Sequence, residues 1–203
     1  MNGSLDRKLW NPDAPLCGVD EAGRGALAGP VAAAAVVMPD GLELDGVDDS
    51  KRLSPLRRER LSREIERSAR AWAVCFSNHR VIDRDNILRA TLAAMRRAVG
   101  RLRVRPGLVL VDGLQLPELD MPARPLVGGD RLSHSVACAS ILAKVHRDRL
   151  MVRLDRRYPG YGFARHKGYP TRQHVAALAE LGASPVHRRS FAPVRRCLGG
   201  NGM

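Results

Sequence analysis

The sequence lacks paired cysteines and any long apolar segment. Its four cysteines are far apart and form no Cys-x-x-Cys pair, which argues against a zinc site and indicates free thiols in a reducing compartment. The longest apolar run, 26–38, contains Gly29-Pro30 and is too short and too broken to span a bilayer. The first ten residues are polar and carry no apolar signal-peptide core. We therefore expect a soluble, cytoplasmic protein with no membrane partner.

Acidic residues are scarce in the last third of the chain. Residues 131–203 hold 14 Lys and Arg against three Asp and Glu, whereas residues 1–130 hold 20 against 18. The net charge is +13 and the pI is about 10.8. Such a charge predicts a polyanionic partner, above all nucleic acid, although an arginine-rich composition can also reflect genome bias. We expect residues 131–203 to form most of the electrostatic footprint.

The order of apolar patterns indicates one α/β domain with a mixed central sheet flanked by helices. A chain of 203 residues can bury a substantial core, and no repeat or linker divides it. Apolar runs predict strands at 16–20, 31–38, 71–76, 108–111 and 125–127. Amphipathic or capped segments predict helices at 55–70, 81–99, 133–157 and 171–181. Strands early in the chain, followed by strands alternating with helices, are typical of this architecture.

Acidic residues follow three of the expected strands. Asp20-Glu21, Asp112 and Asp130 each come at or after the end of an apolar run, with glycine close by. A bare Asp-Glu pair is most simply two solvated acids at a turn. Acids at several strand ends can converge, however, and such carboxylates can hold two divalent ions for phosphodiester chemistry. Because neighbouring strand residues point to opposite faces, both acids reach one metal site only if the strand breaks at the pair, and we expect the glycine of the loop to supply that break.

The ordered motifs of the chain resemble type 2 ribonucleases H, specifically the bacterial ribonuclease HII family. The resemblance covers roughly residues 15–195, and its first motif is CGVDEAGRG at 17–25, followed by Leu27–Val31. The further motifs are Asp49-Ser50-Lys51, Ile82-Asp83 with Asn86-Ile87, Val111–Gly113, Gly129-Asp130, Ala139–Val145, Arg147-Asp148, Tyr161–Phe163, His166–Thr171 and His187–Phe191. The chain departs from the family pattern at Ala26, where proline is common, which loosens the loop. The related ribonuclease HIII carries an extra N-terminal domain, for which we expect no room here.

The resemblance implies a ribonuclease H-like fold and an endonuclease. The whole of 1–203 would be one domain, with a catalytic core at about 15–160 and a small C-terminal helical extension at about 161–195. The enzyme would hydrolyse the RNA strand of RNA–DNA hybrids and cut 5′ to single ribonucleotides in duplex DNA, leaving 3′-hydroxyl and 5′-phosphate ends. Two Mg²⁺ or Mn²⁺ ions would be held by the catalytic acids Asp20, Glu21, Asp112 and Asp130. It would act as a monomer in ribonucleotide excision repair and DNA replication.

The resemblance also implies a set of substrate-binding residues. They are Gly23, Arg24, Gly25, Lys51, Asn86, Lys144, Lys167 and Tyr169. A protein distinguishes RNA from DNA at one position through the 2′-hydroxyl, and backbone groups can approach it where side chains are absent. Gly23-Arg24-Gly25 would read that hydroxyl, with Arg24 holding a phosphate. Tyr169 would contact the sugar on the DNA side of the junction.

Each of these residues has a simpler interpretation. Arg24 and the three lysines can be solvated surface residues, and Lys144 can pair with Asp148 at helical i,i+4 spacing. Tyr169 can be a half-buried packing residue. His166 fits a hydrogen-bonding or phosphate-contacting role better than that of a proton carrier.

Two rival functions remain open from the residues. One is another metal nuclease of the same fold, such as a junction resolvase, which would cut duplexes made only of DNA. The other is a non-catalytic protein that binds hybrids through its basic surface. The complete set of four acids argues against the second.

Overall fold

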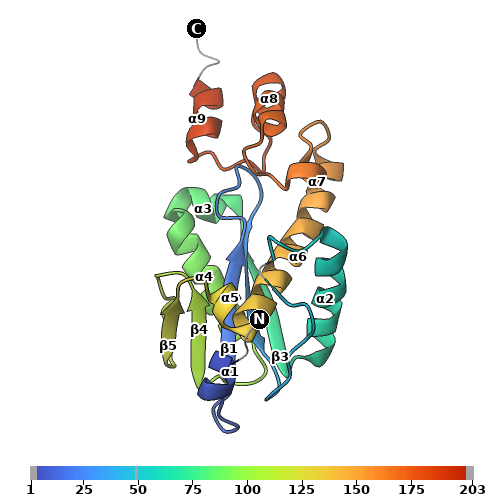
Figure 1. Ribbon diagram of the computed structural model, residues 1–203. Coiled ribbons are helices and arrows are strands. Elements are labelled where there is room, and N and C mark those ends of the chain that lie inside the picture. Colours follow the sequence, from blue (N-terminus) through green and yellow to red (C-terminus); the bar gives the residue numbers. More distant parts are fainter. Residues whose placement is uncertain (1–3, 49, 200–203) are drawn as a thin grey trace.

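The structure, a computed structural model, describes residues 4–48 and 50–199 (Figure 1). Its strands are β1 (Leu16–Ala22), β2 (Val31–Val37), β3 (Ala71–Ser77), β4 (Leu108–Asp112) and β5 (Ala123–Leu126). Its helices are α1 (Ser4–Leu9), α2 (Pro55–Ser68), α3 (His79–Asp85), α4 (Ile87–Gly100), α5 (Gly129–Leu132), α6 (His134–Arg157), α7 (Phe163–His166), α8 (Arg172–Leu181) and α9 (Ala192–Gly199).

The strands form one mixed sheet in the order β3-β2-β1-β4-β5. β1, β2 and β3 pair antiparallel, whereas β4 pairs parallel with β1 and with β5. The register places Val19 of β1 opposite Val111 of β4. Because these two central strands run in the same direction, their carboxyl ends meet at one edge of the sheet. The expected mixed α/β architecture is confirmed.

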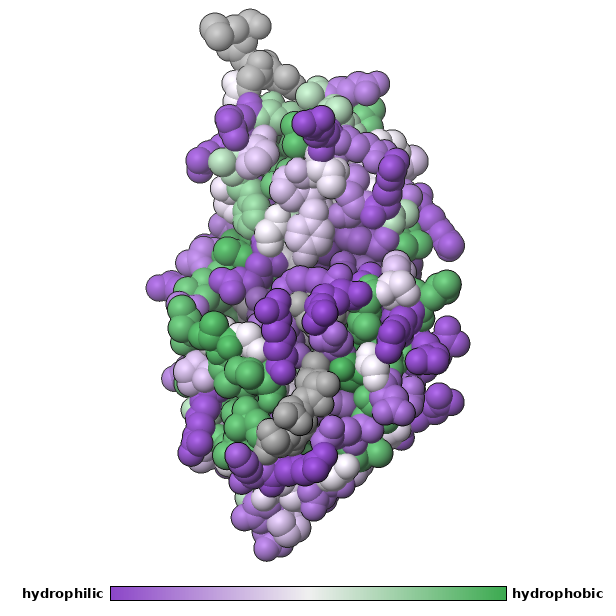
Figure 2. Space-filling model, in the orientation of Figure 1, coloured by the Kyte–Doolittle hydropathy of each residue, from purple (hydrophilic) through white to green (hydrophobic). Residues whose placement is uncertain are grey.

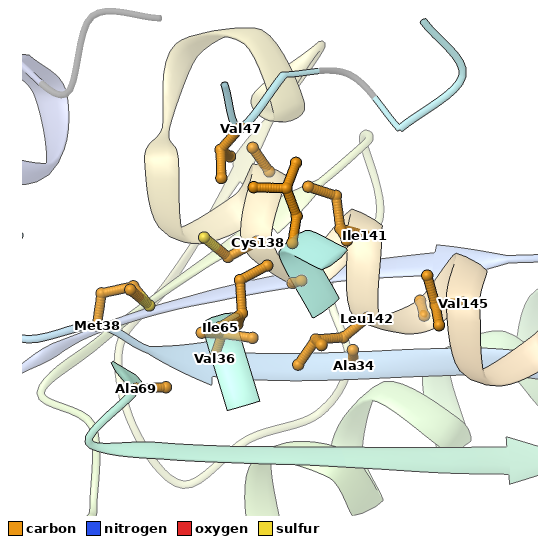
Figure 3. Close-up of a cluster of buried hydrophobic side chains, with 14 of the residues drawn as sticks. Ala34, Val36, Met38, Val47, Ile65, Ala69, Cys138, Ile141, Leu142 and Val145 are labelled. Carbon is orange, nitrogen blue, oxygen red and sulfur yellow. The ribbon is translucent and has the colours of Figure 1, made fainter. Parts of the chain in front are cut away.

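Helices cover both faces of the sheet. On one face, α2 and α6 pack against β2, and Figure 3 shows Ile65 of α2 and Leu142 of α6 meeting Ala34 and Val36. On the other face, α4 packs against the sheet in a second apolar cluster. Gly18 permits the close approach of α6 to β1, because an added Cβ there would lie 2.2 Å from the backbone of Ser135. The sheet is thus held between two apolar layers.

The C-terminal helices α7, α8 and α9 gather beyond one end of the sheet (Figure 1). The segment after β1 joins them to it through backbone hydrogen bonds. The N–H of Leu27 donates to the carbonyl of Gly168 (2.7 Å), and the N–H of Gly29 donates to that of Val186 (2.9 Å). The N–H of Arg188 donates in turn to the carbonyl of Leu27 (2.8 Å). Segment 26–29 therefore lies between two stretches of the C-terminal part.

The structure corrects several expected boundaries. The helix predicted at 81–99 is two helices, α3 and α4, because Asn86 between them has a positive φ of 70°. Its side chain caps α4 by accepting from the N–H of Arg89 (3.0 Å). β5 spans 123–126 rather than 125–127, and the short helices α1, α5, α7 and α9 were not predicted.

Two expectations drawn from missing features concern the membrane and the cysteines. None of the helices in the described part of the chain is long and apolar enough to cross a membrane. All four cysteines are free thiols, as the sequence predicts, and three of them are buried.

Candidate active site

Asp20 and Glu21 lie near the end of β1, at the sheet edge that faces the C-terminal helices. Asp20 is only 5% exposed, and its Oδ1 accepts a hydrogen bond from the N–H of Glu21 (2.6 Å). The strand runs on to Ala22, so the expected break does not fall at the acidic pair. It follows at Gly23, whose φ is +94°. Both acids therefore belong to the regular strand, and the chain turns immediately after it.

Asp112 ends the neighbouring strand β4. Its Oδ1 accepts a hydrogen bond from the N–H of Gly129 (2.7 Å), the first residue of α5. Asp130, the next residue, is 7% exposed. The sequence placed Asp130 at the end of a strand, but β5 ends at Leu126 and Asp130 lies in α5. The Asp112–Gly129 hydrogen bond thus brings α5, and Asp130 with it, to the end of β4.

The charges of these acids act on one another. Burial, followed by the negative charges of Glu21 and Asp112, raises the pKa of Asp20 well above its ordinary value. Burial is also the main cause that raises the pKa of Glu21; the charge of Asp112 adds to it, and that of Arg24 opposes it. Arg24 Nη1 lies 3.5 Å from Glu21 Oε1. Three carboxyl groups from two strands therefore share one poorly solvated place.

Ser140 of α6 lies on the side of Asp20 that faces this helix. Its hydroxyl group lowers the pKa of Asp20, against the stronger effect of burial. Ser140 Oγ also lies 3.0 Å from Ser50 Oγ. Neither serine was among the expected site residues. Both stand inside the motifs quoted above, and that position is the only signal that could have singled them out.

These acids fit a divalent cation in their chemistry. Carboxylate oxygens are the ligands that Mg²⁺ prefers, and a cation would relieve the repulsion among the buried acids. Among residues 4–48 and 50–199, however, no three His, Cys, Asp or Glu side chains already stand in metal-ligand positions. The donors are thus gathered but not closed around an ion, and side-chain rotation would have to complete the site.

The two glycines of the Gly-Arg-Gly loop differ in their surroundings. Gly23 is buried, whereas Arg24 and Gly25 are exposed. A Cβ added to Gly25 would meet only Tyr169, at 4.0 Å. The backbone N–H groups of Arg24 and Gly25 make no hydrogen bond within the described residues. The exposed half of the loop therefore offers two donors beside Tyr169.

Tyr169 is half-buried and lies near two cations of α6. Lys144 Nζ lies 5.7 Å from the centre of its ring, and the guanidinium carbon of Arg147 lies 5.4 Å from it. Lys144 also pairs with Asp148 at 2.8 Å, so the simpler interpretation of that spacing is confirmed. Burial lowers the pKa of Lys144, against the effect of Asp148. The ring is thus fixed in place by charged neighbours.

Lys144 and Lys167 line one hollow of about 330 Å³ between α2 and α6, together with Arg58, Arg149 and Arg165. The ammonium group of Lys167 donates to the carbonyl of Ala164. In Figure 2, which has the orientation of Figure 1, hydrophilic side chains cross the middle of the molecule, between the sheet and the C-terminal helices. Glu59 and Asp148 line the hollow as well and pair with Arg149 and Lys144. The basic residues still outnumber the acidic ones, and this surplus of positive charge suits a phosphate backbone.

The remaining expected residues have other surroundings. Lys51 is exposed, and its charge lowers the pKa of Glu21. Asn86 is an exposed helix cap, as described above. Asp49, from the same motif as Lys51, lies outside the described residues. His166 has the expected hydrogen-bonding role, because its Nε2 lies 2.7 Å from the carbonyl of Tyr161 and its Nδ1 accepts from the N–H of Gly168 (3.2 Å).

Comparison with known proteins gives this arrangement a family. The model of the family "Ribonuclease HII" matches residues 17–194. Ribonuclease HII of Laribacter hongkongensis (strain HLHK9) is 55% identical over 188 residues, which cover 92% of this chain and 95% of that protein. Ribonuclease HII of Desulfitobacterium hafniense (strain Y51) is 51% identical over 194 residues, which cover 95% of this chain and 75% of that protein.

A solved structure agrees. The crystal structure of ribonuclease H2 from Pyrococcus horikoshii OT3 has a TM-score of 0.75 at 26% identity, and the match covers 91% of this chain and 97% of that one. Fold and acidic site together define a nuclease of the ribonuclease H class, a hydrolytic enzyme. Within that class, the chain belongs to the ribonuclease HII family.

Proposed function

We propose that the enzyme hydrolyses the RNA strand of RNA–DNA hybrids and cuts 5′ to single ribonucleotides embedded in duplex DNA. The products would be a 3′-hydroxyl and a 5′-phosphate. The observation that carries the proposal is the meeting of two features at one edge of the sheet. The first is a set of carboxylates near the ends of β1 and β4, of which Asp20 is buried and Glu21 and Asp112 are half-buried. The second is the exposed pair Arg24 and Gly25, which follows Gly23 after β1 and whose N–H groups make no hydrogen bond within the described residues.

In this proposal Asp20, Glu21, Asp112 and Asp130 hold two Mg²⁺ or Mn²⁺ ions. When bound, such ions supply an activated water and stabilise the charge that develops on the phosphate oxygens. Asp20 would be central to holding the ions, because it is buried and feels the charges of both Glu21 and Asp112. The N–H groups of Gly129 and Glu21 orient Asp112 and Asp20 in the structure, and these side chains would rotate from there to close on an ion.

Recognition falls to the loop and to Tyr169. The N–H groups of Arg24 and Gly25 can donate to a 2′-hydroxyl or to the phosphate beside it. Tyr169, next to Gly25, would pack on the adjoining sugar. Lys144, Lys167, Lys51 and Asn86 would hold flanking phosphates. The enzyme would work in this way as a cytoplasmic monomer during ribonucleotide excision repair and DNA replication.

The deciding experiment is cleavage of an end-labelled DNA duplex that carries one ribonucleotide. An all-DNA duplex of the same sequence and an RNA–DNA hybrid serve as parallel substrates, each with Mg²⁺, with Mn²⁺ and with excess chelator. We expect one cut, 5′ to the ribonucleotide, only when a divalent ion is present. Equal cleavage of the all-DNA duplex would favour a resolvase-like nuclease. Binding without any metal-dependent turnover would favour a non-catalytic protein.

A further inference from the structure

Two of the largest fully buried side chains are arginines that have no carboxylate partner. Arg147 of α6 and Arg188, just before α9, are both 0% exposed. Neither forms an ion pair within the described residues. A buried charge is costly unless it is paired or fully hydrogen-bonded. These two guanidinium groups therefore need another source of stabilisation.

Backbone carbonyl groups supply it. Arg188 donates from Nε to the carbonyl of Gly29 (2.9 Å), from Nη1 to that of Arg24 (2.7 Å) and from Nη2 to that of Gly23 (2.8 Å). Arg147 donates from Nε to the carbonyl of Pro30 (2.9 Å), from Nη1 to that of Lys167 (2.9 Å) and from Nη2 to that of Ala28 (3.3 Å). Five of these six acceptors lie in segment 23–30. The planar fork of arginine thus fixes the direction of each carbonyl.

Gly23 is shaped to this arrangement. A Cβ added there would lie 1.8 Å from Nε of Arg147, and the φ of +94° is itself unfavourable for a residue with a side chain. The absence of a side chain at Gly23 therefore leaves room for the buried guanidinium group of Arg147. Gly25, by contrast, is open to solvent on the substrate side. The two glycines of the loop serve different purposes.

The same arginines also reach the aromatic side chains around the loop. The guanidinium carbon of Arg147 lies 5.4 Å from the ring centre of Tyr169, and that of Arg188 lies 5.1 Å from the ring centre of Phe191. Arg147 hence contacts both proposed recognition elements, the loop and the tyrosine. Burial first, and then the charge of Arg147, lowers the pKa of Arg188 to about 9.

We propose that Arg147 and Arg188 are positioning residues for recognition of the ribonucleotide. They hold the carbonyl groups of segment 23–30 inward, which leaves the N–H groups of Arg24 and Gly25 for the substrate. Their two positive charges form no ion pair within the described residues, although Asp83 and Asp148 act on them from farther away, and they favour a substrate phosphate near the loop. This inference rests on the proposed function of the Gly-Arg-Gly loop. The competing account is that the two arginines only stabilise the fold.

Arg188→Lys and Arg147→Lys test the proposal, because lysine keeps the charge but loses the planar fork of donors. The control is Arg97→Lys. Arg97 lies on α4, away from the loop, and it also donates to a backbone carbonyl, that of Phe76 in β3 (3.0 Å). Three quantities are measured for each variant: kcat/KM on the single-ribonucleotide duplex, the Kd for the all-DNA duplex without divalent ions, and the melting temperature.

We expect kcat/KM to fall at least ~10-fold in each of the two variants, and toward ~100-fold if the loop moves by about 1 Å. The Kd for all-DNA duplex should stay within about twofold of the wild type, because net charge is kept. Arg97→Lys should change neither quantity. A loss of cleavage and of DNA binding together, in step with a lower melting temperature, would overturn the proposal, and so would unchanged cleavage.

If Arg188→Lys does not fold, Phe191→Leu replaces it, since it removes the ring packed on the guanidinium group but keeps an apolar side chain for the two apolar clusters that Phe191 also contacts. The same selective loss of cleavage is then expected at a smaller size, roughly 3- to 10-fold. An equal loss of cleavage and of DNA binding would again contradict the proposal. Failure of the wild type to cut at a ribonucleotide would instead refute the proposed function.

Discussion

Between the sheet and helices α2 and α6 the protein buries mainly alanine, valine, leucine and isoleucine, whereas between α6 and segment 184–191 it buries arginine and histidine beside a smaller apolar cluster around Met151 and Phe163. Apolar burial is strong but non-directional. Hydrogen bonds to backbone carbonyl groups fix orientation within narrow limits. The sheet therefore provides stability, and the C-terminal part provides the geometry of the loop that ends β1.

Histidines extend this polar packing to Tyr169. Nδ1 of His187 accepts from the N–H of Ser184 (3.0 Å), so its proton is on Nε2 and donates to Nε2 of His174 (3.0 Å). Nδ1 of His174 then donates to the carbonyl of Tyr169 (2.9 Å). A chain of neutral imidazoles thus links the backbone of Ser184 to that of Tyr169. Substitutions in the two regions should consequently have different signatures.

The largest effect is expected at the sheet edge itself. Asp112→Asn removes one charge of the acidic site but keeps an Oδ1 that can accept from Gly129, so the fold should survive. Turnover should fall by at least ~100-fold, the scale that one electrostatic group contributes to a transition state. Single-turnover cleavage of the ribonucleotide duplex with Mg²⁺, beside a melting curve, measures both quantities. Near-normal cleavage would remove Asp112 from the site.

A core substitution should lower stability without changing specificity. Leu142 is fully buried in the cluster between α2, α6 and the sheet. Leu142→Ala should lower the free energy of unfolding by about 2–5 kcal/mol. Because apolar packing does not orient the loop, cleavage of both substrates at a temperature well below melting should stay near that of the wild type. A selective loss on the single-ribonucleotide duplex would show that the two regions are not separable.

The contrast between apolar packing against the sheet and polar packing in the C-terminal part also explains which features the sequence could predict. Alternating and continuous apolar runs placed β1 to β4, α2, α6 and α8 correctly, because burial leaves a periodic pattern. The pattern could not show the break at Asn86, where the apolar positions continue across the two helices. Nor could it show that Arg147 and Arg188 are buried, because arginine has a charged end that is normally solvated. The acids were found from their places at the ends of expected strands, whereas the recognition role of the loop came only from the family motifs.

Tyr169→Ala tests the polar region directly. The ring lies beside Gly25 and is held by Lys144 and Arg147, so its loss should misplace the sugar at the junction. We expect cleavage at a single ribonucleotide to fall by up to ~100-fold, with much smaller changes in melting temperature. Rates on a continuous hybrid, whose neighbouring sugar is not a deoxyribose, provide the comparison. If both rates fall equally and track a lower melting point, Tyr169 is a packing residue only.

The histidines should make the C-terminal part sensitive to acid. Burial, then the charge of His174, lowers the pKa of His187 to about 4, and the charges of His166 and His79 act in the same direction. Between pH values of about 4 and about 6.5, the unfolded chain, whose histidine pKa is about 6.5, binds more protons than the folded protein. Stability should therefore fall as the pH drops through this range. The loss should be on the order of 1–3 kcal/mol. His187→Gln should flatten this part of the curve of melting temperature against pH, relative to the wild type, and an unchanged slope would contradict the assignment.

The smallest expected effect concerns single surface charges. Arg165 of α7 is exposed and lines the same hollow as Lys144 and Lys167. If it contacts a phosphate, Arg165→Gln should reduce the slope of log Kd against log salt concentration by roughly 0.9, the value for one released counterion on duplex DNA. Arg101→Gln is the control. Arg101 is also exposed, but it follows the last turn of α4, within residues 1–130, where positive and negative charges nearly balance. Kd for an all-DNA duplex at several salt concentrations, without divalent ions, gives both slopes. An equal change in the control would show that the basic footprint is spread over the whole surface and does not belong to residues 131–203.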